Sequence, residues 1–141
     1  MSGQDLTPLD RLLIEQAGAR LIYRYAALID AGQSDALAAL FTETGRYARP
    51  AGPADVLEGR AAILAEFKSR PPRLMRHVVA NVTVNAQSPT SASAHSRVVL
   101  YLGAPDGTLD KTMVGDFHDQ LEKVGEDWLF AERRGSVTLK G

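Results

Sequence analysis

Apolar residues recur at helical spacing through the first part of the chain. Between Thr7 and Ala31 they repeat about every 3.6 residues, at Leu9, Leu12, Leu13, Ala17, Leu21, Tyr25, Leu28 and Ile29. Thr7 is suited to the N-cap and Pro8 to the first helical position, while Gly32 is suited to the turn that follows a helix. The pattern therefore predicts a long amphipathic helix that ends close to Asp30.

Two shorter helices are predicted next. Ser34 is suited to cap a short helix that runs through residues 35–41. Residues 59–69 mix apolar and charged positions as a surface helix does, and the Pro-Pro pair that follows at 71–72 ends it. Between these helices, residues 44–49 predict a short strand, and the sequence Pro-Ala-Gly-Pro-Ala at 50–54 predicts a loop.

The second half of the chain is rich in strand-forming residues. We expect strands at 75–87, 92–102, 112–123 and 128–140. The turn Ala-Pro-Asp-Gly ends at residue 107, and the turn Val-Gly-Glu-Asp ends at residue 127. Helices followed by strands in hairpins predict an α+β fold, with three N-terminal helices packed on a curved, mainly antiparallel sheet. A twisted sheet of this size curls into a cone-shaped barrel whose mouth can hold a ligand.

Composition narrows the class of protein. The 141 residues are enough for one domain, which we expect to span 1–141, and 45% are apolar while 23% are charged. The net charge of −1 gives no electrostatic reason to expect nucleic acid or an anionic membrane as a partner. The chain has no cysteine, which excludes disulfides, thiol nucleophiles and cysteine-bound zinc. No secretion signal or membrane span is recognisable, so a cytoplasmic protein is expected.

Candidate chemistry centres on Asp30 and His77. A carboxylate that orients an imidazole can take a proton from carbon or oxygen without a cofactor, and no cofactor is expected. An acidic residue at the end of a helix is unfavourable for the helix dipole, which favours a functional role for Asp30. The alternative is that Asp30 only terminates the helix and that His77 is structural. We expect no metal, because no two histidines have a ligand spacing such as i, i+4.

Five segments together resemble the SnoaL-like branch of the nuclear transport factor 2-like superfamily. They are Tyr-Ala-Ala-Leu-Ile-Asp at 25–30, Ala-Leu-Phe-Thr-Glu-Thr-Gly-Arg-Tyr at 39–47, Glu-Gly-Arg-Ala-Ala-Ile at 58–63, Arg-His-Val-Val-Ala-Asn at 76–81 and Gly-Glu-Asp-Trp-Leu-Phe-Ala-Glu-Arg-Arg at 125–134. Their order covers nearly the whole chain. The resemblance implies the cone-shaped fold and brings the end of the first helix to the start of a long strand.

Two enzyme groups of this branch, the gamma-hexachlorocyclohexane dehydrochlorinases and the scytalone dehydratases, look most similar at the pocket. Both have an Asp and a His at the positions of Asp30 and His77. Tyr25 stands where the dehydrochlorinases have a lysine, and Arg133 stands where they have an arginine. Tyr101 stands where the dehydratases have a second pocket histidine. The resemblance thus implies proton abstraction, on a substrate other than those of the two groups.

Given the meeting of Asp30 and His77 that the resemblance implies, side-chain chemistry predicts a role for each pocket residue. Asp30 would accept the Nδ1–H of His77 and leave its Nε2 as the base. Candidates to bind substrate are Tyr25, Arg133, Asn81, Tyr101 and Arg97, because strand alternation predicts that Asn81 shares a face with His77 and that Arg97 shares one with Tyr101. The apolar wall is expected to include Phe117, Val79 and Val99.

Three hypotheses follow. The first is a cofactor-independent lyase that uses Asp30 and His77 as a general base on a small hydrophobic cyclic or aromatic substrate. The second is a polyketide cyclase or isomerase, and the third is a non-catalytic ligand-binding or dimerisation module. A homodimer or homotrimer is expected in each case. The basic segment 70–76 indicates either an anion site or a solvated connection, and we favour the connection.

Overall fold

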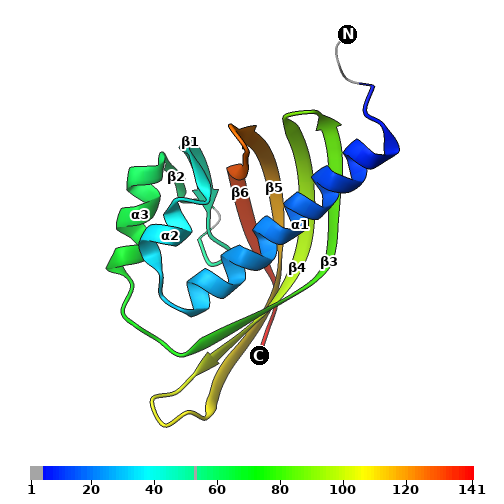
Figure 1. The fold of residues 1–141 in the computed structure, drawn as a ribbon. Coiled ribbons are helices and arrows are strands. Elements are labelled where there is room, and N and C mark those ends of the chain that lie inside the picture. The colour runs from blue at the N-terminus through cyan, green and yellow to red at the C-terminus, as the bar shows by residue number, and fades with distance from the viewer. Residues whose placement is uncertain (1–4, 53) are drawn as a thin grey trace.

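One long helix lies along one face of a curved six-stranded sheet (Figure 1). The computed structural model describes residues 5–52 and 54–141. Helix α1 (Pro8–Asp30) comes first, and the short helices α2 (Ser34–Ala38) and α3 (Arg60–Ser69) flank the other end of the sheet. This arrangement confirms the predicted α+β class with helices on a curved, mainly antiparallel sheet.

The strands form one sheet in the order β2-β1-β6-β5-β4-β3. Their bounds are β1 (Phe41–Ala48), β2 (Val56–Glu58), β3 (Met75–Ser88), β4 (Ser91–Gly103), β5 (Leu109–Val124) and β6 (Asp127–Lys140). β1 pairs with β6 in parallel, and every other neighbouring pair is antiparallel. The four long strands match their predicted positions, whereas the three-residue strand β2 was not predicted.

Helix α1 begins and ends where the sequence predicts. The Thr7 hydroxyl accepts a hydrogen bond from the Asp10 backbone at 3.0 Å, and the Asp10 carboxylate accepts one from the Thr7 backbone at 2.9 Å. This capping box satisfies two amide donors that the first turn leaves free. At the other end, Gly32 has a φ of +69°, which a glycine adopts without strain. The helix therefore stops at Asp30 and leaves that side chain at its last position.

The second helix differs from its prediction. Ser34 lies inside α2 rather than capping it, and the N-cap position belongs to Gln33, which makes no side-chain capping bond. The helix ends at Ala38, and Phe41 already begins β1. Phe41 is fully buried against the aromatic core, so its packing in the sheet outweighs any weak helical preference.

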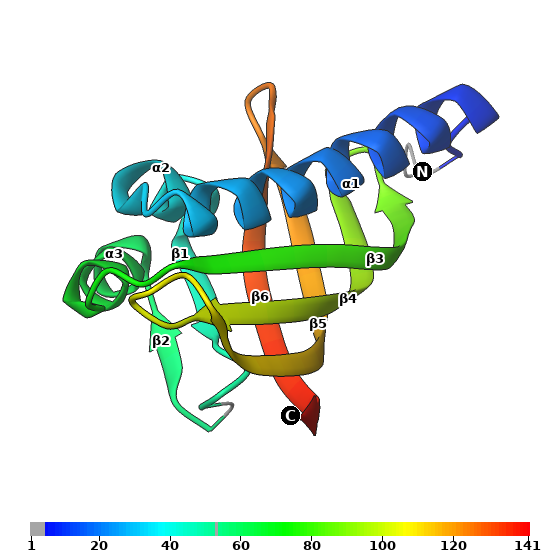
Figure 2. The same cartoon turned by 90° about the horizontal axis from the view of Figure 1, so that it is seen from below.

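The sheet curls so that its inner face and the helices enclose a core without closing into a full barrel. Figure 2 shows α1 running along β3, with the far ends of β4 and β5 bending toward α3. Gly18 allows the close approach of α1, because an added Cβ would lie 2.8 Å from Val84 Cγ1 and 3.1 Å from Leu121 Cδ1. Among the described residues, no helix is long and apolar enough to cross a membrane.

Candidate functional site

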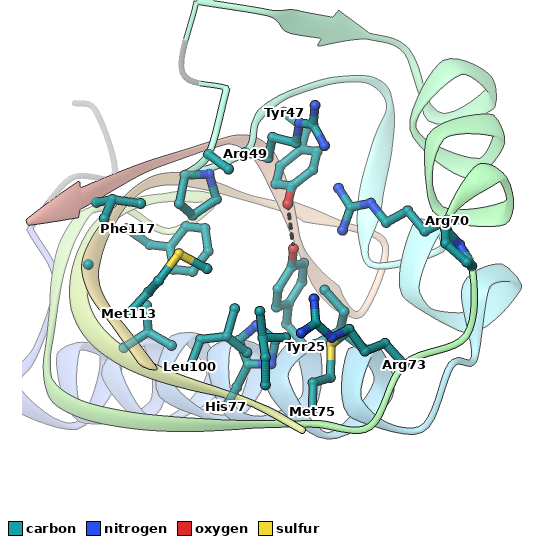
Figure 3. A pocket seen from close by; sticks show the side chains of 18 residues that line it. Tyr25, Tyr47, Arg49, Arg70, Arg73, Met75, His77, Leu100, Met113 and Phe117 are labelled. Carbon is teal, nitrogen blue, oxygen red and sulfur yellow. Dashed lines mark hydrogen bonds between the residues drawn. The ribbon is translucent and has the colours of Figure 1, made fainter. Parts of the chain in front are cut away.

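A cavity of about 370 Å³ lies between the last turn of α1, the inner face of the sheet and the segment after α3 (Figure 3). This volume is within the range of sites for small molecules. Most of its wall is apolar, with side chains that include Ile29, Val98, Leu100, Leu102, Met113 and Val137. The few polar groups in this wall can therefore fix the orientation of a ligand.

Asp30 and His77 meet at this wall through two hydrogen bonds. The ring Nδ1 of His77 lies 2.6 Å from Asp30 Oδ1, and the backbone N–H of His77 donates to Asp30 Oδ2 at 2.8 Å. An ionised carboxylate only accepts hydrogen bonds, so it holds the proton on Nδ1 and leaves the Nε2 lone pair free. The side chains are 9% exposed for His77 and 15% for Asp30, so water contacts neither one extensively. His77, but not Asp30, lines the cavity.

The local backbone explains how the two residues come together. Asp30 ends α1, whose packing along β3 brings it beside the first strand residues after Met75. The Asp30 carboxylate accepts two donors from one residue of β3, which compensates for its unfavourable place at the negative end of the helix. Arg76, next to His77, is exposed on the opposite face of the strand, as regular alternation predicts.

Burial lowers the pKa of His77 below its ordinary value of 6.5. The hydrogen bond and negative charge of Asp30 raise this pKa, but burial and the positive charges of Arg133 and Arg70 outweigh that effect. Asp30 therefore raises the proton affinity of the imidazole without setting the net direction of its pKa shift. At neutral pH the imidazole is neutral, which is the form that accepts a proton.

Tyr25 and Tyr47 place a hydroxyl pair in the cavity. The Tyr25 hydroxyl donates a hydrogen bond to the Tyr47 hydroxyl at 3.0 Å (Figure 3). Burial is the main cause that raises the pKa of Tyr25 well above its ordinary value, and the proximity of Tyr47 is the second. This hydroxyl therefore stays protonated. Because the Tyr47 oxygen accepts the hydrogen bond from Tyr25, the hydroxyl proton of Tyr47 remains available to a ligand. Phe117 packs against Tyr25 and also lines the cavity.

Arg133 is buried behind the cavity rather than in its wall. Only 1% of its surface is exposed, and it is not among the residues that line the cavity. Its guanidinium lies over three rings, 4.3 Å from Tyr25, 3.7 Å from Phe117 and 4.6 Å from Phe130. The prediction that Arg133 contacts substrate directly is therefore wrong, because β6 directs this side chain into the aromatic core.

Three further candidates lie outside the cavity. Asn81 is exposed, since its φ of +52° and a register shift between Ala80 and Thr83 interrupt the alternation that would have kept it beside His77. Arg97 and Tyr101 do share a face, but it is the outer one, where Arg97 lies 3.5 Å from Asp116.

The same alternation corrects the predicted apolar wall. The inward side chains of β4 are Val98, Leu100 and Leu102, so Val99 does not line the cavity. Val79 packs against the core instead of the cavity.

Sequence reasoning missed Tyr47, Arg49 and Arg70 as cavity residues. Tyr47 was assigned to a strand without a role, although an aromatic hydroxyl in a buried strand is a signal for a polar partner. Arg70 opens the basic segment that we assigned to a solvated connection. The structure instead places its side chain in the cavity wall (Figure 3), so that assignment is wrong for Arg70.

Comparison with known proteins identifies the family. The sequence profile of the SnoaL-like domain matches residues 10–134. The chain belongs to the SnoaL-like family. This confirms the resemblance on which the sequence analysis relied. No curated protein matches the chain in sequence.

Several solved structures share the fold. A protein proposed to be a scytalone dehydratase, from Novosphingobium aromaticivorans, superposes with a TM-score of 0.80 at 24% identity, over 89% of this chain and 85% of the other. A type 2 hexachlorocyclohexane dehydrochlorinase gives 0.83 at 16% identity, over 96% and 92%. A protein from Xanthomonas campestris, proposed to be an association domain of calcium/calmodulin-dependent protein kinase II, gives 0.75 at 19%, over 85% and 84%. At these identities the similarity shows the fold alone.

Proposed function

We propose that this protein is a cofactor-independent lyase that removes a proton from carbon in a small cyclic or aromatic substrate. The hydrogen-bonded pair of Asp30 and His77 at the wall of a mostly apolar cavity supports this function. The orienting carboxylate, the free Nε2 and the limited access of water are the elements that general base catalysis requires. The pair is not specific to one reaction, so an isomerase or polyketide cyclase that begins with the same step is the second candidate.

In the proposed reaction, His77 Nε2 takes a proton from a carbon of the substrate. The electron pair of that C–H bond becomes the new π bond while the bond to the leaving group on the adjacent carbon breaks, and the leaving group departs with its electron pair. Asp30 holds the imidazole in the reactive tautomer and stabilises the imidazolium that forms. An isomerase would instead return the proton to a different carbon.

The Tyr47 hydroxyl is the group that would donate to an oxygen of the substrate as negative charge develops there. Its oxygen already accepts a hydrogen bond from the Tyr25 hydroxyl, and a donor that also accepts a hydrogen bond is polarised further. The low exposure of both tyrosines strengthens such a bond relative to water. This arrangement favours substrates with a carbonyl or enol oxygen next to the acidic C–H.

Proton exchange tests the assignment of the base. The wild-type protein and the variant His77→Gln are incubated in D₂O with 2-tetralone, a cyclic ketone with acidic C–H bonds, and exchange is followed by proton NMR. The wild type should exchange faster than buffer, and the variant should lose a factor of about 10²–10⁴. The control His95→Gln changes a histidine on the outer face and should leave the rate unchanged. A variant His77→Gln with the wild-type rate would eliminate His77 as the base.

A non-catalytic binding or dimerisation module remains a distinct candidate, because the fold also occurs in a protein proposed to be an association domain. Val78 and Tyr101 are exposed on the outer face of the sheet, at 51% and 41%, which supports an interface there in a homodimer or homotrimer. Light scattering after size-exclusion chromatography measures the mass directly. An oligomer that dissociates in Tyr101→Arg, together with no proton exchange by the wild type, would favour this candidate over the enzyme.

A further inference from the structure

Three arginines and no acidic residue line the cavity, among the residues that the structure describes. Arg49, Arg70 and Arg73 lie along the side of the cavity away from Met113 and Phe117 (Figure 3), and the remaining wall consists of apolar side chains, two tyrosines and His77. An entirely neutral, apolar substrate gives no reason for cationic groups in this position. The distribution of charge instead points to a ligand with a negative end and an apolar body.

Nearby carboxylates neutralise the positive charges of these three arginines only in part. Arg70 Nε lies 3.2 Å from Glu66 Oε2, and Arg49 Nη1 lies 3.6 Å from the same oxygen. Arg73 pairs separately with Asp110. Two guanidinium groups thus share one carboxylate, and no second carboxylate pairs with either of them among the residues that the structure describes.

Arg70 directs an unused donor into this region. Its Nη2 is buried from solvent and meets no acceptor at hydrogen-bonding geometry within the part of the chain that the structure describes. Burial is the largest single influence and lowers the pKa of the Arg70 guanidinium, but Tyr47, Tyr25 and Glu66 together raise it by more, so the group stays cationic. Figure 3 shows the guanidinium reaching toward the hydroxyl pair of Tyr25 and Tyr47. A buried charged donor without an acceptor costs more free energy than a satisfied one, and a ligand oxygen would remove that cost.

A purely structural role accounts for only part of this geometry. Arg70 follows α3 directly, lies 5.1 Å over the ring of Phe67 and pairs with Glu66 one helical turn earlier. These contacts use its Nε and the face of its guanidinium and would stabilise the end of the helix. They leave Nη2 unused, and they do not explain why Arg49 approaches the same carboxylate oxygen.

We propose that the substrate is a carboxylic acid, whose carboxylate binds Arg70 while its ring lies along the apolar wall toward His77. A monoanion would balance two guanidinium groups that share one carboxylate, and a planar guanidinium matches a carboxylate in geometry. This inference deepens the proposed function and rests on it for the chemistry that follows binding. Binding itself is independent of whether His77 acts as a base.

Matched ligands test the inference. Binding of benzoate, benzamide and phenyl phosphate is measured by isothermal titration calorimetry at pH 7.5. Benzoate and benzamide have nearly the same shape and differ in charge. The wild type should bind benzoate about tenfold or more tightly than benzamide, as expected for a charge-assisted hydrogen bond in a partly buried site.

Substitutions at two positions, Arg70 and Glu66, should change this preference in opposite directions. Arg70→Gln should abolish it, while Arg70→Lys, which keeps the charge, should retain part of it. Glu66→Gln removes the competing carboxylate and should strengthen benzoate binding several-fold. Circular dichroism establishes that each variant is folded, and the gain in Glu66→Gln does not depend on the stability of the Arg70 variants.

The variant His77→Gln separates this inference from the proposed function. It should lose proton exchange yet keep the preference for benzoate, so either idea can fail alone. Equal binding of benzoate and benzamide by the wild type would overturn the inference, as would a preference that survives in Arg70→Gln. If phenyl phosphate bound more tightly than benzoate and Arg70→Gln lost this binding, the inference of a carboxylic acid would be overturned in favour of a phosphate ester.

Discussion

Asp119 and Arg133 form a buried pair in which we expect the ionised carboxylate to destabilise the folded protein. Asp119 Oδ1 lies 3.6 Å from Arg133 Nε, and neither oxygen of the carboxylate has a hydrogen-bond partner among the described residues. Burial raises the pKa of Asp119 from its ordinary value of 3.8 to about 6, although the positive charge of Arg133 opposes the shift. The ionised carboxylate is therefore a net cost to the folded state near neutral pH.

The perturbation that isolates this cost is Asp119→Asn, which replaces the carboxylate with a neutral group of the same shape. A carboxyl whose pKa is higher in the folded than in the unfolded protein contributes most stability below about pH 4. It loses that contribution as the pH rises to about 6. The interval of about two pKa units corresponds to about 3 kcal/mol at pH 7. The variant should thus be more stable than the wild type by up to about 3 kcal/mol at pH 7 and nearly equal at pH 4.

Removing one partner of a buried ion pair usually destabilises a protein by leaving the other charge alone. Arg133 differs from that case because its guanidinium keeps other favourable contacts. It lies over the rings of Tyr25, Phe117 and Phe130, all within 4.6 Å, and cation–π attraction remains after the carboxylate is gone. Because of these rings, we expect Asp119→Asn to increase the stability of the folded protein rather than decrease it.

Urea unfolding measures the difference in stability between the wild type and Asp119→Asn at pH 7 and at pH 4. The single tryptophan, Trp128, reports the transition by fluorescence, and far-UV circular dichroism reports it independently. Protein concentration is held constant because an oligomer would make the midpoint depend on it. Asp116→Asn is the matched control on the same strand. The hydrogen bond from His95 lowers the pKa of Asp116, so this variant should lose a little stability at pH 7 and less at pH 4. An Asp119→Asn variant that is less stable than the wild type at pH 7 would refute the reasoning and show that Arg133 requires the ionised partner.

Two further predictions concern the catalytic pair and the packing of the helix. Asp30→Asn removes the hydrogen bond and charge that raise the pKa of His77 and hold its tautomer. Proton exchange in D₂O should therefore fall by about 10²–10⁴, and its acid limb should move to lower pH; an unchanged profile would show that Asp30 does not orient the base. Gly18→Ala should destabilise the protein by about 1 kcal/mol or more in urea unfolding, since overpacking against Val84 exceeds the gain in helix propensity. A stabilised variant would show that α1 can move away from the sheet at little cost.

The elements of the fold were largely predictable because each has a local cause. Helical spacing, the Thr7 cap and Gly32 set the limits of α1, and alternation with turn sequences set the four long strands. Strand β2 was missed because three residues are too few to show a period of two. The short α2 was predicted too long because Phe41 is held in the sheet by contacts with residues distant in sequence.

The site was harder to predict because the direction of a side chain depends on register. The resemblance supplied the positions of Asp30 and His77, which the structure brings within hydrogen-bonding distance. It supplied nothing about Asn81, whose positive φ interrupts the alternation only four residues after His77. Arg70 was assigned to solvent because composition alone does not distinguish a solvated arginine from one that turns into a cavity. That distinction depends on the path of the chain between α3 and β3, which long-range packing determines.

The charges around His77 make its base strength depend on what occupies the cavity. In the unoccupied protein, the positive charge of Arg70 is one of the contributions that lower the pKa of His77. A bound carboxylate would offset that charge, so the pKa of His77 should be higher in the complex than in the free protein. The acid limb of kcat, which reports the complex, should then lie at higher pH than that of kcat/KM, which reports the free protein. With Arg70→Gln the two limbs should coincide more closely. Limbs that already coincide in the wild type would mean that no substrate charge reaches Arg70, even if His77 is the base.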